Sequence, residues 1–135
     1  MGGLLSVSWL GILIATASAF VLGGLWYSPL LFDKAWRNAT KLTDAELKSG
    51  SPIVTFGGAF VLSLVAAVVF AVFLGPSPGI VFGTAAGFAA GLFWVASSFG
   101  INYLFEKKPL ALFFINGGYH TVQFTLYGLI IGWLQ

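Results

Sequence analysis

The sequence predicts an all-α, polytopic membrane protein with four transmembrane helices and an interfacial amphipathic helix between the first and the second. Only 7% of its 135 residues are charged and 59% are hydrophobic, whereas about a quarter of a soluble domain is charged. Four apolar runs, 5–27, 52–74, 80–104 and 110–134, are each long enough to cross about 30 Å of hydrocarbon. Runs of this length fit neither a β-barrel nor a soluble core. We therefore expect one domain, 1–135.

The first apolar run is predicted to be a permanent helix. Its leading segment, MGGLLSVSWLG, lacks the basic residues of a cleavable signal. The run ends at Trp26 and Tyr27, whose amphipathic rings favour the membrane interface, and Pro29 then bends or ends the helix. We expect both rings to contact lipid headgroups.

The following link, 28–51, is predicted to be a cytoplasmic amphipathic segment. At 100° per residue from Phe32, apolar side chains including Trp36 share one face, and Lys34, Arg37 and Lys41 share the other. Such a helix lies in the headgroup plane with its cations toward anionic lipid. The alternative is a disordered basic loop. The TDAE sequence at 43–46 fits a capping box, which predicts a second short helix from Thr43.

The remaining links define the topology. The uncharged turn GPSPG, 75–79, separates the second and third runs, and EKKP, 106–109, separates the third and fourth. All six Lys and Arg residues fall in the first and third links. Because positive residues are retained in the cytoplasm, both links are expected inside and both termini outside. The expected location is the bacterial inner membrane.

Two short matches indicate an internal duplication. LFDK at 31–34 and LFEK at 104–107 both end an outside-to-inside helix, and PIVTFGG and PLALFFINGG open the helices that follow. Two parallel two-helix repeats would explain these matches. Short matches in so biased a composition also arise by chance, so the repeat and a coincidence both remain open.

Small residues at helical spacing are predicted to hold the helices together, because lipid tails are as apolar as leucine and burial alone cannot do so. They could instead act as flexible gating points. The packing surface exceeds what one bundle needs, so we expect a homo-oligomer. The glycines assigned to packing are Gly79, Gly83, Gly87, Gly91, Gly128 and Gly132.

A polar stripe lies on the fourth run. Asn116, His120, Gln123 and Tyr127 project within roughly 60° of one another, and Asn102 of the third run could join them near the cytoplasmic end. Each group would cost several kcal/mol if left bare in hydrocarbon. The stripe either makes interhelical hydrogen bonds or lines a polar path, with His120 as its titrating or ligand-contacting group.

The residue inventory argues against catalysis and cofactors. The chain has no cysteine and one histidine, which rules out disulfides and thiolate sites and leaves no metal site or catalytic triad predicted. No phosphate-binding loop with a Lys is present. A net charge of +2 gives no reason to expect a nucleic-acid partner. We expect a non-enzyme without a cofactor.

Three segments, LWYSPLLFDKAW, KLTDAELK and INGGYH with Gly128 and Trp133 downstream, resemble the bacterial membrane-protein family catalogued as domain of unknown function 1761. The resemblance spans nearly the whole chain, and WYSPLLF.KAW is its most specific part. In that family a Gly is usual where this chain has Asp33. The resemblance implies a small multi-spanning membrane protein and brings no reaction, substrate or site.

Two functional hypotheses follow. In the first, the protein is a small-solute or ion permeation unit whose route is lined by the polar stripe. In the second, it is a non-catalytic structural or lipid-binding protein, in which the stripe connects helices and the basic segment contacts anionic headgroups. A membrane enzyme is a weaker third, given the shortage of acid–base pairs. The sequence does not identify a ligand.

Overall fold

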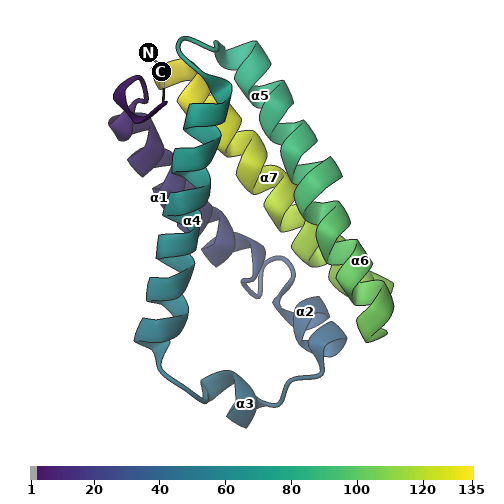
Figure 1. Ribbon diagram of the computed structural model, residues 1–135. Helices are drawn as coiled ribbons and strands as arrows, with labels where there is room; N and C mark the ends of the chain where they lie inside the picture. The colour runs from purple at the N-terminus through teal and green to yellow at the C-terminus, as the bar shows by residue number, and fades with distance from the viewer. Residues whose placement is uncertain (1–2) are drawn as a thin grey trace.

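The computed structural model describes residues 3–135 and is all-α, so that positions 1 and 2 of the predicted domain lie outside the described residues (Figure 1). The third long helix is continuous but contains a π-helical segment, η2. The elements are η1 (Gly3–Leu5), α1 (Trp9–Trp26), α2 (Asp33–Thr40), α3 (Asp44–Lys48), α4 (Pro52–Leu74), α5 (Ile80–Ala89), η2 (Ala90–Ala96), α6 (Ser97–Glu106) and α7 (Leu110–Leu134).

Three helices are long and apolar enough to cross a membrane: α1, α4 and the continuous α5–η2–α6 helix, Ile80–Glu106. The sequence predicted four. The fourth candidate, α7, has 25 residues, but the polar stripe lowers its apolar character, and it is not among the three. Length and composition therefore establish three potential crossings among residues 3–135.

Local signals explain where the helices begin. α1 begins at Trp9 rather than residue 5, because the Ser8 side chain accepts a hydrogen bond from the Gly11 amide and caps the helix there. α4 has Ser51 as its N-cap and Pro52 in the first turn. The predicted capping box is confirmed: Thr43 accepts from the Glu46 amide, and the Glu46 carboxylate accepts from the Thr43 amide.

Helix α7 is the centre of the bundle. It packs along α5, η2 and α6 on one side and against α1 on the other, while α4 packs mainly against α1 (Figure 1). The main core lies toward the end of the molecule that carries the termini. It includes Ile12 and Ala15 of α1, Phe70 of α4, and Tyr127 and Ile131 of α7.

Glycines bring α5 and α7 to backbone contact. A Cβ added at Gly83 would collide with the carbonyl oxygen of Gly128, and one at Gly87 would collide with that of Phe124. Close approach of this kind is how helices associate where lipid removes the hydrophobic driving force. Five of the six glycines assigned to packing would bring an added Cβ into the opposite helix: Gly83, Gly87, Gly91, Gly128 and Gly132. Gly79 has nothing within 4 Å of an added Cβ, and it contributes the carbonyl oxygen that a Cβ at Gly132 would meet.

The π-helical segment keeps this contact in register. Four-residue steps advance about 400°, so a ladder of them drifts by roughly 40° per step away from the partner helix. The contact steps by four residues as far as Gly91, which faces Thr121, and then by five to Ala96, which faces Gly117. The extra residue in η2 thus returns the small face to α7.

The opposite end of the molecule is open. α4 diverges from α1 and α7 toward α3 (Figure 1), and each α4 residue over 52–62 is exposed. Ile53 is 83% exposed and Leu62 is 71% exposed. This half of α4 is therefore exposed along its length, although the Phe60 ring still meets Phe20 of α1 at 5.9 Å.

We predict that Gly128→Ala destabilises the fold, because the new methyl group meets the Gly83 backbone, which cannot move without separating the two helices. Overpacking of this kind costs about 1–3 kcal/mol. The free energy of unfolding in mixed micelles measures it. Gly58→Ala is the control, since nothing lies within 4 Å of a Cβ there, and it should be neutral or slightly stabilising. Equal effects of the two substitutions would contradict the backbone contact.

Candidate functional site

Three members of the polar stripe form one hydrogen-bonded chain. His120 Nδ1 lies 2.6 Å from Gln123 Oε1, and Gln123 Nε2 donates to the Tyr127 hydroxyl over 2.9 Å. That hydroxyl donates to the backbone carbonyl oxygen of Ser63 in α4 over 3.0 Å. Gln123 and Tyr127 are buried, at 4% and 0% exposure. The chain therefore ends on a protein acceptor and connects α7 to α4.

Asn116, the fourth member, joins two other helices. Its Oδ1 accepts a hydrogen bond from the Tyr27 hydroxyl over 2.7 Å, and its Nδ2 donates to the Tyr103 hydroxyl of α6 over 2.8 Å. Both ends of the amide are thus used within the protein. Asn116 thus connects α7 both to the C-terminal end of α1 and to α6. This contact lies at the charged end of the bundle, which carries α2, α3 and the α6–α7 link.

His120 is half-buried between aromatic rings. Its ring stacks on Phe99 at a centroid distance of 5.0 Å and an interplanar angle of 10°, and the Tyr119 ring meets it edge-on at 4.9 Å. Phe99 follows η2 by three residues, so the π-helical segment sets the position of this stack. The side-chain hydrogen bonds of His120 and Gln123 among residues 3–135 stay within α7, so His120 meets the neighbouring helix through the Phe99 ring.

Asn102 does not join the stripe. It is exposed and lines a shallow cavity of about 360 Å³ on the outer face of η2 and α6, with Trp94, Val95, Ser98 and Phe99. A one-residue insertion shifts all later side chains by about 100° relative to a uniform helix. The π-helical segment therefore accounts for the difference from the sequence prediction.

The two aromatic residues expected at the interface turn inward. Trp26 Nε1 donates to the Ile115 carbonyl oxygen over 2.9 Å, and its ring packs on Phe32 at 4.8 Å. Tyr27 bonds to Asn116, and its partial burial is the main cause that raises the pKa of its hydroxyl, which stays protonated. These hydrogen bonds attach the end of α1 to α7.

The amphipathic segment folds as predicted into two short helices joined by Arg37. Its Nε donates to Asp33 Oδ1 and its Nη1 to Asp44 Oδ1, both over 2.9 Å. The hydrogen bond to Asp33 is the main cause that raises the pKa of the guanidinium. Within residues 3–135 neither Lys34 nor Lys41 makes an ion pair, and both side chains are exposed.

A cavity of about 580 Å³ opens between α1, α2 and α4, and we call it the α1–α4 groove. It lies where α4 diverges from α1. Apolar side chains form most of its wall, and Asp33 and Trp36 line its α2 end. Its lining residues are Ala19, Phe20, Gly23, Gly24, Tyr27, Asp33, Trp36, Phe56, Ala59, Ser63 and Tyr119.

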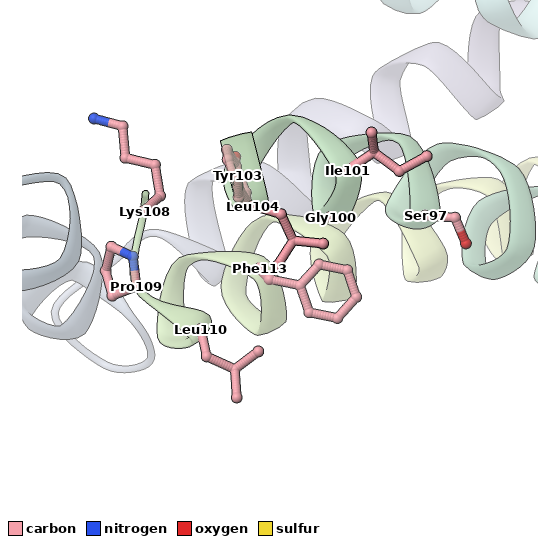
Figure 2. Close-up of a pocket in the computed structure, with 9 residues that line it drawn as sticks. All are labelled: Ser97, Gly100, Ile101, Tyr103, Leu104, Lys108, Pro109, Leu110 and Phe113. Atoms are coloured by element: carbon pink, nitrogen blue, oxygen red, sulfur yellow. The ribbon is translucent and has the colours of Figure 1, made fainter. Parts of the chain in front are cut away.

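A second groove, of about 390 Å³, lies between α6 and the start of α7 (Figure 2). Phe113 and the Gly100 backbone form its floor, and the Lys108 side chain extends away from the other lining residues. None of the four stripe residues on α7 lines any of these three cavities. Over residues 3–135 no group of three His, Cys, Asp or Glu side chains is placed to hold a metal ion.

One family model matches most of the chain. The family described as "Protein of unknown function (DUF1761)" matches residues 10–132, nearly all of the described bundle. The chain belongs to the DUF1761 family. No curated protein and no solved structure matches this DUF1761 chain. The family assignment thus fits a small protein with apolar helices and assigns no activity to it.

Several polar contacts of this DUF1761 chain were not predicted. The Tyr119 hydroxyl donates to the Ala19 carbonyl oxygen over 2.9 Å and holds α1 against α7. Gln135 accepts from the Ser8 amide and donates to two carbonyl oxygens at the end of α4. Tyr119 directly follows the Gly117–Gly118 pair, and no residue spacing indicates that it reaches Ala19. The Gln135 contacts depend on tertiary placement alone.

We predict that the Asn116–Tyr27 hydrogen bond stabilises the fold. A double-mutant cycle of Asn116→Ala and Tyr27→Phe should give a coupling free energy of about 0.6–2 kcal/mol, the range of interhelical hydrogen bonds in membranes. Unfolding in mixed micelles measures the four variants. Asn102→Ala with Tyr27→Phe is the control pair and should show no coupling. Strict additivity of the Asn116 pair would contradict the bond.

Proposed function

We propose that this DUF1761 protein is a non-catalytic integral membrane protein that organises lipid at the charged end of its bundle. The observation that carries this proposal is the division of its polar groups. The stripe on α7 is bonded to protein and lines no described cavity. The lysines of the amphipathic segment are left available to solvent and headgroups.

We infer that α7 is a fourth crossing helix. It lies between α1 and the α5–η2–α6 helix and packs along both (Figure 1), so it occupies the same depth as its neighbours. Its polar side chains are bonded internally, which is the condition for a polar helix in hydrocarbon. α2, α3 and the end of α6 gather at one end, and both termini at the other (Figure 1).

The orientation follows from this arrangement. Every basic residue belongs to the end that carries α2, α3 and the α6–α7 link. The positive-inside rule puts that end in the cytoplasm and both termini outside. The bacterial inner membrane is the proposed location.

A homo-oligomer belongs to the same proposal. The exposed half of α4, over 52–62, is covered by lipid or by another copy, and Gly57 there would allow close approach. The parallel two-helix repeat also stays a proposal, and it rests on the sequence matches. The two pairs differ in packing: α1 and α4 diverge, whereas α5–η2–α6 and α7 stay in contact throughout (Figure 1).

We predict that Lys34→Gln combined with Lys41→Gln weakens association with anionic lipid. Each Lys near an anionic surface contributes about 1 kcal/mol. Loss of both should therefore lower the preference for phosphatidylglycerol over phosphatidylcholine about thirtyfold. Spin-labelled lipids report the preference in reconstituted membranes. Asn38→Gln on the same helix changes no charge and serves as the control. An undiminished preference in the double variant would refute the lipid role.

A second function, permeation of a small solute or ion, is favoured by one observation. The π-helical segment η2 lies against α7 beside His120, and π turns are frequent at functional sites. In this alternative, the stripe rearranges to admit a solute past His120.

The permeation alternative predicts that His120→Ala abolishes flux in proteoliposomes while the oligomer stays intact. Entry of protons and of small cations is followed with entrapped fluorescent indicators, and size-exclusion chromatography in detergent follows assembly. Phe99→Leu keeps His120 and serves as a packing control. Flux that persists unchanged in the His120 variant rules out a path through the stripe.

A further inference from the structure

The α1–α4 groove combines an apolar wall with a charged mouth. Phe20 and Phe60 meet at a centroid distance of 5.9 Å and bring α1 and α4 together at one side. From there the groove widens toward Trp36 and Asp33 of α2. Its volume of about 580 Å³ falls within the range of about 300–1,000 Å³ of small-molecule sites. A ligand that fits it has an apolar chain and a polar head at the interface.

Asp33 is the charged residue that lines the mouth of the groove. Asp33 and Asp44 both accept hydrogen bonds from Arg37, which lies beside the groove and is not among its lining residues. Asp33 Oδ1 accepts from Arg37, while Oδ2 has no hydrogen-bond donor within residues 3–135. The Asp33 side chain is 28% exposed. A cationic head with N–H donors complements this oxygen.

Arg37 offers hydrogen-bond donors next to the Asp33 carboxylate. Two of its five N–H donors are used by the carboxylates, and its side chain is 47% exposed. The remaining donors suit a phosphate. A carboxylate and a guanidinium side by side thus match the ammonium and the phosphate of one zwitterionic headgroup.

We propose that the α1–α4 groove binds one phosphatidylethanolamine molecule, with an acyl chain between α1 and α4, its ammonium on Asp33 and its phosphate on Arg37. This inference deepens the proposed lipid function and rests on it. An acyl chain gains little by leaving other lipid tails for an apolar groove. Selection therefore depends on the headgroup contacts at Asp33 and Arg37.

The test compares two variants with matched controls. Ala59→Leu fills the groove from α4, whereas Ala17→Leu makes the same change at an exposed position of α1 that does not line it. Asp33→Asn removes the charge and keeps the size of the side chain. The purified protein is reconstituted in nanodiscs of phosphatidylcholine, phosphatidylethanolamine and phosphatidylglycerol. Native mass spectrometry then counts the lipids retained.

The wild type and Ala17→Leu are expected to retain one phosphatidylethanolamine per chain in preference to phosphatidylcholine, which has no N–H donor. Ala59→Leu should lose that lipid, and Asp33→Asn should lower the preference about fivefold. Retention by Ala59→Leu equal to the wild type, or a preference unchanged in Asp33→Asn, overturns the site. Equal retention of the two zwitterionic lipids by the wild type overturns it as well.

The anionic lipid in the same nanodiscs separates this inference from the proposed function. Preference for phosphatidylglycerol depends on Lys34 and Lys41 and should survive Ala59→Leu. If that preference is absent while one phosphatidylethanolamine is still retained, the anionic-lipid role fails and the groove stands. If the preference is present and no phosphatidylethanolamine is retained, the groove fails and the anionic-lipid role stands.

Discussion

The backbone contact between α7 and the α5–η2–α6 helix is the interaction on which the rest of the structure depends. In hydrocarbon, apolar side chains gain nothing by leaving lipid for a neighbouring helix. Helices therefore associate through dispersion and polar contacts at short range. Glycines on both helices allow that range, so that a methyl group at Gly83 or Gly128 would meet the opposing backbone. With α7 fixed in this way, its remaining faces determine where α1 and α4 can pack.

The hydrogen bonds of the polar stripe also follow from a hydrocarbon environment. A bare amide or imidazole in hydrocarbon has no water to bond to, and α7 carries four polar side chains at helical spacing. The close packing brings Tyr103 of α6 and the Ser63 carbonyl oxygen of α4 within reach of Asn116 and Tyr127. The stripe thus specifies which helices surround α7. The end that carries α2 and α3 differs, because its lysines are exposed and form no ion pair within residues 3–135.

Much of the fold could be predicted from the sequence. The apolar run between Pro52 and Gly75 predicted the bounds of α4, and the capping box at Thr43 predicted the start of α3. Both could be predicted because both signals are local in the sequence. The side-chain partners could not be predicted. Tyr27 has the composition of an interface anchor, and only the position of α7 decides that it bonds to Asn116. Asn102 was misplaced because the π-helical segment, which no residue pattern marks, rotates the helix that follows.

The central claim is that the bundle spans a bilayer with its basic links on one side and its stripe sealed inside. The chain has no cysteine, so single cysteines introduced at Lys41, Ser77 and His120 can be tested with a membrane-impermeant maleimide in sealed vesicles of both orientations. The account predicts that the Lys41 and Ser77 positions are labelled from opposite sides and that the His120 position stays unlabelled from either. Labelling of the Lys41 and Ser77 positions from the same side would contradict it.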